Sequence, residues 1–286
     1  LSGWIALQFI RKPEDAREHF LALRTAATDA DEVSEAEYWL GRTAAALGKG
    51  TEALVHYRQA AEHPLTYYGQ LAIQSVNPGP KALDLTPTPK PTLKDFETFR
   101  SRDAVQAIAL VRSVDLEKLA PLFFYQLART IKSPGEVVLL AEMAQEMDQP
   151  YASVRLSKIA LNRGLPVAEL AYPINMLPEY KEINVPVESA LLYALSRQES
   201  EFNPGARSPV GARGLIGVAH LGDLLSDYDG SYILTLVAYN AGPGRVRDWT
   251  EEYGDPRDKG TDPIDWVERI PFTETRNYVK KILTGV

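Results

Sequence analysis

A helical spacing of apolar residues runs through almost the whole sequence, and two proline-rich passages interrupt it. Strand-like alternation of apolar and polar residues is nearly absent, so we expect an all-α chain. The passage at 77–91 holds five prolines and the passage at 165–186 holds four. Proline lacks the amide donor that continues a helix. We therefore predict a helical domain over 1–168, interrupted at 77–91, a linker over 169–186, and a second compact helical domain over 187–286.

The clearest repeat in the first domain covers Glu35–Glu62. Small residues there recur where two helices would approach closely, and Leu and Tyr would fill the groove between them, as in a tetratricopeptide helix pair. A weaker copy of this pattern stands 100 residues further on, at Met147, Ala152, Ser157 and Ala160. Two such copies favour an α-superhelical (tetratricopeptide-like) solenoid over a single bundle.

Charge and residue types exclude several functions. The chain has 286 residues, 31 of them basic and 38 acidic, so its formal charge is −7. This acidic balance is a poor match to nucleic-acid binding, and we expect no nucleic-acid partner. The absence of cysteine excludes thiolate metal sites and cysteine nucleophiles. The apolar run at 4–10 is too short to span a bilayer, and no longer run follows, so we expect no transmembrane segment.

A helix over Glu188–Ser200 is predicted to carry the most informative carboxylate. Leu191, Leu195 and Glu199 follow one another at intervals of four, which places them on one helix face. A carboxylate on an apolar face is costly when ionised, and the negative end of the helix dipole adds to that cost. Both effects favour the protonated form that a general acid needs. An ordinary half-exposed Glu at the end of an amphipathic helix is the alternative interpretation.

Three groups of residues in the last ninety positions add to this signal. They read ESEFNP and ARSPVGARGL at 199–204 and 206–215, AYNAGPG at 238–244, and IPFTETRNYV at 270–279. In this order they resemble the soluble lytic transglycosylase family, whose lysozyme-like α-helical catalytic domain is similar to goose-type lysozyme. That family carries an α-superhelical domain before the catalytic one, and the string YYGQLA at 67–72 is also typical of it.

The resemblance implies a role for each matching residue. Glu199 corresponds to the single catalytic acid and base of the family. The expected substrate-binding residues, in the cleft and its walls, are Ser208, Tyr239, Asn240, Glu274 and Tyr278, with Arg276 in the last motif. No cofactor is implied, and no metal site is expected. The histidines stand at spacings unlike those of metal ligands, and the acidic stretch Asp248–Asp265 lacks the spacing of a calcium loop.

The reaction that the resemblance implies needs one carboxylate rather than the usual pair. Glu199 would protonate the oxygen of the β-1,4 bond between N-acetylmuramic acid and N-acetylglucosamine, and the substrate's N-acetyl group would stabilise the charge at C1. Glu199 would then deprotonate the muramyl O6 hydroxyl, which attacks C1 and forms a 1,6-anhydro product without water. The resemblance also implies a periplasmic enzyme with peptidoglycan glycan strands as its partner, and cell-wall proteins as partners of the helical domain.

Two alternatives stay open at this point. A muramidase with the same Glu199 would let water intercept C1. A glycan- or partner-binding scaffold would keep an inactive lysozyme-like domain.

The sequence departs from the family after Gly214-Leu215. A Gly-Leu-Met-Gln string and about thirty further residues that wall the cleft should follow there, in keeping with the family's usual length at that wall. Instead, Gly217 follows Ile216 directly, and the expected glutamine has no counterpart. Either the segment is truly deleted or it is missing from the sequence at this join. We expect Leu215 and Ile216 to belong to one side of the cleft and Val218–Leu225 to begin a different helix. If residues are missing, the Cα atoms at the join should lie much farther apart than the 3.8 Å of bonded residues.

Overall fold

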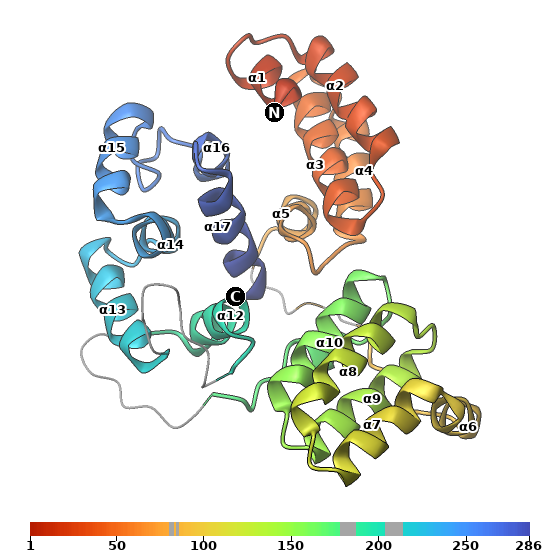
Figure 1. Cartoon of the computed structure of the whole chain (residues 1–286). Coiled ribbons are helices and arrows are strands. Elements are labelled where there is room, and N and C mark those ends of the chain that lie inside the picture. Colours follow the sequence, from red (N-terminus) through yellow and green to blue (C-terminus); the bar gives the residue numbers. More distant parts are fainter. Residues whose placement is uncertain (80–82, 84–85, 178–186, 204–213) are drawn as a thin grey trace. The chain divides into compact units, whose positions relative to one another are not determined.

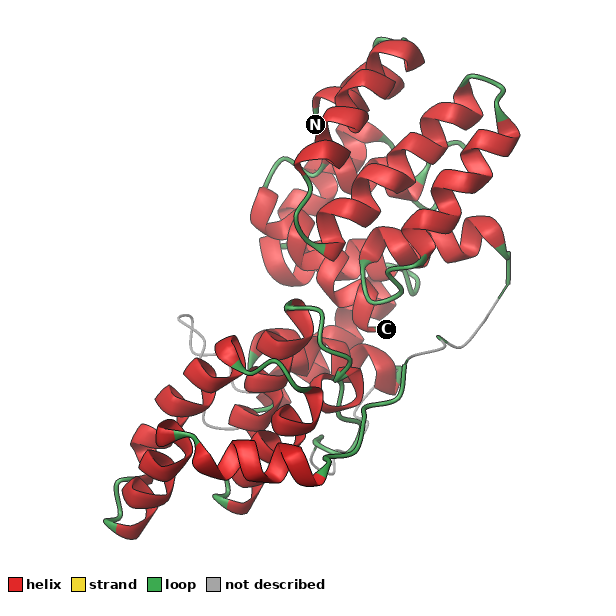
Figure 2. Cartoon of the chain, turned by 90° about the vertical axis from the view of Figure 1, so that its right-hand side faces the viewer, coloured by secondary structure: helices red, strands yellow, loops and turns green. Residues whose placement is uncertain are grey.

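The computed structural model describes the whole chain except residues 80–82, 84–85, 178–186 and 204–213, with side chains also left undescribed at 214–219. Every regular element in the described ranges is a helix, as Figure 2 shows. The predicted all-α class is therefore confirmed. None of the described helices combines the length and apolarity needed to cross a membrane.

The described chain forms two compact units (Figure 1). The first contains residues 1–83, 180–195 and 214–286, and the second contains 84–179 and 196–213. Each unit combines segments that are separate in the sequence but contact one another in the fold. The predicted division into 1–168, 169–186 and 187–286 therefore stays a prediction.

The first unit begins with five helices that pack in sequence. These are α1 (Ser2–Gln8), α2 (Pro13–Ala26), α3 (Ala30–Ala46), α4 (Gly50–Ala61) and α5 (Tyr67–Val76). Their core is aromatic, with the rings of Phe20 and Trp39 stacked at 5.8 Å. At Gly41 an added Cβ would lie 2.6 Å from the ring of Tyr57, so a small residue is required where α3 meets α4. This close approach is the one that the repeat pattern predicts.

The remaining helices of the first unit come from the C-terminal part of the chain. They are the start of α12 (Ser189–Glu199), then α13 (Gly214–Asp227), α14 (Tyr232–Ala241), α15 (Pro243–Tyr253), α16 (Pro263–Arg269) and α17 (Thr273–Gly285). Helix α14 contacts α13, α15 and α17. Its residues Leu234 to Ala238 are all buried. This apolar helix is the centre around which the other C-terminal helices pack.

Helices α16 and α17 are also held by the N-terminal helices. The Tyr68 hydroxyl of α5 donates a hydrogen bond to Glu268 of α16 at 2.5 Å and accepts one from Lys280 of α17 at 2.7 Å. The ammonium of Lys280 lies 2.8 Å from the Glu268 carboxylate, and both side chains are largely buried. Burial raises the pKa of Tyr68 well above its ordinary value, so the hydroxyl stays protonated and available as a donor.

Three further contacts join the same regions. They run from Trp4 Nε1 to Asp265 at 3.0 Å, from Arg42 to Asp262 at 2.8 Å, and from the Gln70 amide to the Thr284 carbonyl oxygen at 2.9 Å. The first 76 residues and the last helices thus form one packed body.

The second unit is a smaller helical assembly. It contains α6 (Leu93–Ser101), α7 (Asp103–Ser113), η1 (Glu117–Leu119), α8 (Ala120–Thr130), α9 (Pro134–Glu146), α10 (Pro150–Asn162), α11 (Ala168–Ala171) and the last turn of α12. Its core includes Phe124, Ile131, Leu140 and Leu156, all fully buried. The Arg102 guanidinium makes two hydrogen bonds to the buried Glu136 carboxylate, at 2.5 and 2.9 Å.

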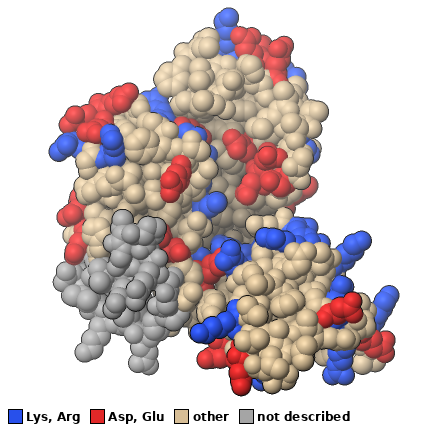
Figure 3. Space-filling model, viewed as in Figure 1, with Lys and Arg blue, Asp and Glu red and all other residues tan. Residues whose placement is uncertain are grey.

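The proline-rich passage at 77–91 ends a helix as predicted, whereas the passage at 165–186 contains the short helix α11. Helix α5 stops at Val76 and the next helix begins at Leu93. On the face drawn in Figure 3, basic and acidic side chains are interspersed on both units.

The prediction that a different helix begins at Val218 is wrong. One helix, α13, runs from Gly214 to Asp227, so Ile216 and Gly217 are consecutive residues within it, and no new helix begins at Val218. The stretch contains no proline that would stop a helix, and its apolar residues continue the helical pattern.

Candidate active site

The predicted general acid is the last residue of α12. Leu191 and Leu195 of this helix are buried, with 0% and 6% of their surface exposed, whereas Glu199 is exposed. The expectation that Glu199 shares their apolar environment is therefore wrong. The reason is its position, since it lies one turn beyond the packed part of the helix. An exposed carboxylate at a helix end is accessible to a large substrate.

The backbone turns sharply just after Glu199. The amide of Phe202 donates to the Ser196 carbonyl at 3.3 Å, and the amide of Asn203 donates to the Ser200 carbonyl at 2.9 Å. Glu201 and Phe202 have φ values of +51° and +64°, in the left-handed region that residues other than glycine seldom adopt. Such conformations persist where surrounding contacts enforce them, and they are enriched at functional sites.

The residue two positions before Glu199 is tied to the second unit. The Nε of Arg197 donates to the Ala171 carbonyl at 2.7 Å, and its guanidinium lies 3.8 Å from the centre of the Tyr172 ring. Burial lowers the pKa of Arg197, while Tyr172 and Glu201 work in the opposite direction. These contacts fix the last turn of α12 against the segment after α11.

Two other predicted residues lie at the end of α14. The half-buried ring of Tyr239 is nearly parallel to that of Tyr278, with an interplanar angle of 7° and centroids 6.5 Å apart. The Tyr239 ring also contacts the ring of His220, with 5.9 Å between the two centroids. Asn240 is exposed, and its side-chain oxygen accepts a hydrogen bond from Thr275 at 2.7 Å. Residues of α14 and α17 are thus brought together.

Helix α17 supplies the rest of the predicted set. Glu274 is exposed in the first turn, where the positive end of the helix dipole favours a carboxylate. Arg276 donates to the Ile270 carbonyl at 2.9 Å and so closes the turn before the helix. Tyr278 is buried.

The structure therefore groups Tyr239, Asn240 and Tyr278 on two packed helices of the first unit, with Glu274 one turn from Tyr278 on α17. Glu199 belongs to the second unit, and Ser208 lies outside the described residues. The sequence interpretation missed Thr275 as the partner of Asn240, although it stands inside the ETR string. Among the described residues, no group of three or more acidic or histidine side chains could hold a metal ion.

Comparison with known proteins shows what this part of the chain is similar to. The transglycosylase SLT domain model matches residues 176–216 and 215–261. The soluble lytic murein transglycosylase of Escherichia coli K12 is 35% identical over 124 residues, which cover 32% of this chain and 19% of the relative. The Salmonella typhimurium protein of the same name is 33% identical over 131 residues, covering 34% and 20%.

Solved structures extend the likeness to nearly the whole chain. An inactive Glu-to-Gln mutant of lytic transglycosylase Slt from Pseudomonas aeruginosa superimposes with a TM-score of 0.75 at 24% identity, over 99% of this chain and 49% of that one. The 70-kDa soluble lytic transglycosylase of Escherichia coli gives 0.65 at 23%, over 96% and 48%. These matches show the fold, with its superhelical and lysozyme-like parts. The chain spans about half the length of these proteins.

The comparisons also bear on the join at Ile216. The two matched segments of the family model meet at residues 215–216. In addition, 32% of 286 residues is about 92 residues, fewer than the 124 aligned positions of the Escherichia coli relative. The relative thus carries about thirty positions within the aligned region that have no counterpart in this chain. The chain thus matches the transglycosylase SLT domain model over residues 176–261 and is similar to soluble lytic transglycosylases in sequence and fold.

Proposed function

We propose that this protein cleaves the β-1,4 bond between N-acetylmuramic acid and N-acetylglucosamine of peptidoglycan without water and releases 1,6-anhydromuramyl products. The observation that carries the proposal is the position of Glu199, Tyr239 and Asn240 inside the two segments matched by the transglycosylase SLT domain. The Pseudomonas neighbour, a lytic transglycosylase whose Glu-to-Gln mutant is inactive, supports an essential glutamate in such an enzyme.

In this proposal Glu199 acts first as acid and then as base. Its exposed position at the end of α12 suits a group that must meet a polymer. It would protonate the glycosidic oxygen while the N-acetyl group of the substrate stabilises C1. The resulting carboxylate would take the proton from the O6 hydroxyl as that oxygen attacks C1.

The other predicted residues would bind the glycan. Asn240 and Glu274 are exposed and offer polar groups. The half-buried ring of Tyr239 would form an apolar wall, supported from behind by the buried ring of Tyr278. Ser208 keeps its proposed place near the scissile sugar on the resemblance alone. We further propose a periplasmic location, a catalytic domain over 187–286 after a linker at 169–186, and a superhelical domain over 1–168 that receives cell-wall proteins.

Mass spectrometry of muropeptides released from purified sacculi tests the reaction. We expect products with 1,6-anhydromuramyl ends. Products with reducing ends would instead identify a hydrolytic muramidase. Binding to sacculi without any release would overturn the proposal and identify a scaffold.

Glu199→Gln tests the assignment of the acid. The amide keeps the shape of the side chain but can neither donate nor accept the catalytic proton. Because general acid and base catalysis is worth about 10²–10⁴-fold, we expect a loss in the upper part of that range. The matched control is Glu146→Gln, which changes another exposed glutamate at the last position of a helix. If Glu199→Gln keeps more than about a tenth of the wild-type rate, the loss is far smaller than general acid and base catalysis requires, and the assignment of Glu199 is wrong.

A further inference from the structure

The residue two positions after Glu199 is held by two cations of α10. A carboxylate oxygen of Glu201 lies 3.0 Å from Lys158 Nζ, and the other lies 3.9 Å from Arg155 Nε. The side chains of Glu201 and Lys158 are three-quarters buried, with 24% and 22% exposed. An ion pair in this setting is less weakened by solvent than one on the open surface.

Arg155 makes a second contact within the second unit. The guanidinium of Arg155 lies 4.7 Å from the centre of the Tyr125 ring of α8. Lys158 and Arg155 are three residues apart on one helix, so both face the same side. Glu201 therefore meets two positive groups on one side of α10, of which Lys158 is 22% exposed and Arg155 is 56% exposed.

The backbone explains why such a clamp is needed. Glu201 and Phe202 both adopt left-handed φ values, and neither is glycine. This conformation is disfavoured for residues other than glycine, so contacts from outside the turn are needed to hold it. Arg197 anchors the chain two residues before Glu199 through the Ala171 carbonyl, and Glu201 anchors it two residues after. Glu199 therefore lies between two residues, Arg197 and Glu201, that are both bonded to other parts of the second unit.

We infer that Glu201 is a positioning residue, whose ion pairs with Lys158 and Arg155 hold the strained turn after α12 and thereby the direction of the Glu199 carboxylate. The inference rests on the proposed function for its catalytic consequence. Its structural part, the clamping of the turn, stands independently of that function.

The catalytic consequence is tested with Glu201→Gln and with the charge exchange Glu201→Lys combined with Lys158→Glu. A misplaced catalytic group costs rate rather than affinity, so we expect Glu201→Gln to lower kcat at least about tenfold with little change in KM. The charge exchange should restore much of the loss, because it rebuilds the pair with opposite polarity. An unchanged kcat, or a change confined to KM, would overturn the inference.

A readout that does not depend on activity separates this inference from the proposed function. Hydrogen–deuterium exchange of the amides at 196–203 should speed up about tenfold or more in Glu201→Gln, while Tm and exchange in α9 stay as in wild type. Glu146→Gln is again the control. If exchange at 196–203 does not change, the inference fails even where the wild-type protein cleaves peptidoglycan. If exchange at 196–203 speeds up in Glu201→Gln but the wild-type protein does not cleave peptidoglycan, the proposed function is wrong and the structural part of the inference still holds.

Discussion

Tyr68 shows how much one hydroxyl group can hold together in this molecule. It donates to Glu268 and accepts from Lys280, and it is almost fully buried. Tyr68→Phe would leave the buried pair of Glu268 and Lys280 without its third partner. We expect a loss of about 1–3 kcal/mol in the free energy of unfolding, measured by urea denaturation. The control is Tyr67→Phe, because the Tyr67 hydroxyl makes no hydrogen bond among the residues that the structure describes. Equal effects from both variants would contradict this account.

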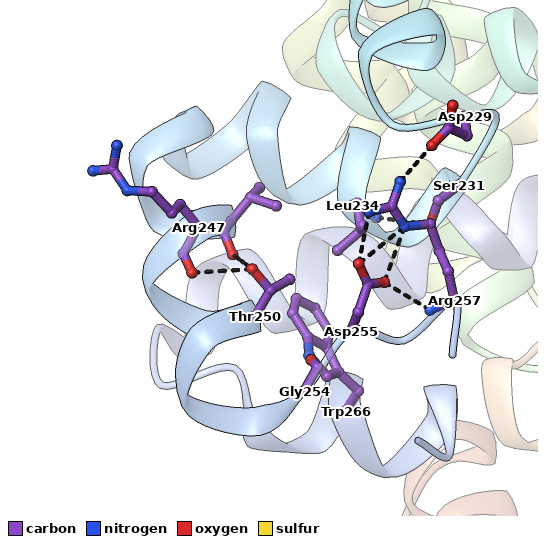
Figure 4. Close-up of polar contacts among 10 residues, drawn as sticks. Asp229, Ser231, Leu234, Arg247, Thr250, Gly254, Asp255, Arg257 and Trp266 are labelled. Carbon is purple, nitrogen blue, oxygen red and sulfur yellow. Dashed lines mark hydrogen bonds and ion pairs between the residues drawn. The ribbon is translucent and has the colours of Figure 1, made fainter. Parts of the chain in front are cut away.

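A second residue-scale prediction concerns pH. In Figure 4, Arg257 bonds Asp255, with 2.6 Å between Nη2 and Oδ2, and also reaches Asp229 at 2.8 Å. The hydrogen bonds from Arg257 lower the pKa of Asp255, while partial burial works against them. A lowered pKa in the folded state adds stability that is present above the unfolded pKa of about 3.9 and is lost as pH falls through the folded value.

Asp255→Asn should therefore lower Tm at pH 7, and the difference from wild type should shrink as the pH falls below the unfolded pKa of about 3.9. The pair is partly exposed, so the loss at pH 7 should stay within about 1 kcal/mol. Thermal unfolding of both proteins across this pH range makes the measurement. Asp248→Asn, at a half-exposed pair with Arg245, is the control. A Tm difference that grows toward low pH would refute the prediction.

At the scale of elements, the junction between α4 and α5 depends on a glycine. A Cβ added at Gly69 would lie 1.9 Å from the His63 carbonyl oxygen, which is backbone and cannot move aside cheaply. Thr66 caps α5 at the same place by accepting from the Gly69 amide at 3.1 Å. Gly69→Ala should thus shift α5 and cost about 3 kcal/mol or more.

Gly50→Ala is the matched control for this junction. Gly50 is also near a helix start, but an added Cβ there would meet no atom within 4 Å. We expect its Tm to equal or slightly exceed that of wild type, since alanine favours the helix more than glycine does. Comparable destabilisation by the two variants in thermal unfolding would show that helix propensity, not the close approach, is at work.

At the scale of the whole molecule, helix α17, which carries Glu274 and Tyr278, and its neighbour α16 depend on the start of the chain. Trp4, Arg42, Tyr68 and Gln70 all contact α16 or α17. A fragment of residues 187–286 would lose these bonds at once. With each worth about 1 kcal/mol, its Tm should fall at least about 10 °C below that of the full chain. Circular dichroism makes the comparison. A fragment as stable as the full chain would disprove this dependence.

The sequence by itself determined what depends on neighbours in the chain. It predicted the all-α class, the helix end at the proline-rich passage 77–91, and a helix ending at the candidate acid Glu199. Periodicity and proline chemistry act over a few residues, so they can be read locally. The strings at 199–215, 238–244 and 270–279 likewise indicated the family, since motif matching needs no tertiary contact.

Only the tertiary structure decided how distant segments meet. The bonds of Tyr68 to Glu268 and of Trp4 to Asp265 join residues 200 and 261 positions apart, and no local pattern encodes such partners. The exposure of Glu199 was decided in the same way, because a face that is apolar in sequence is buried only where another element covers it. The clamp of Lys158 and Arg155 on Glu201 likewise exists only once α10 packs beside the turn. Many pairs of side chains in this sequence are chemically compatible, and only the tertiary structure shows which of these pairs form.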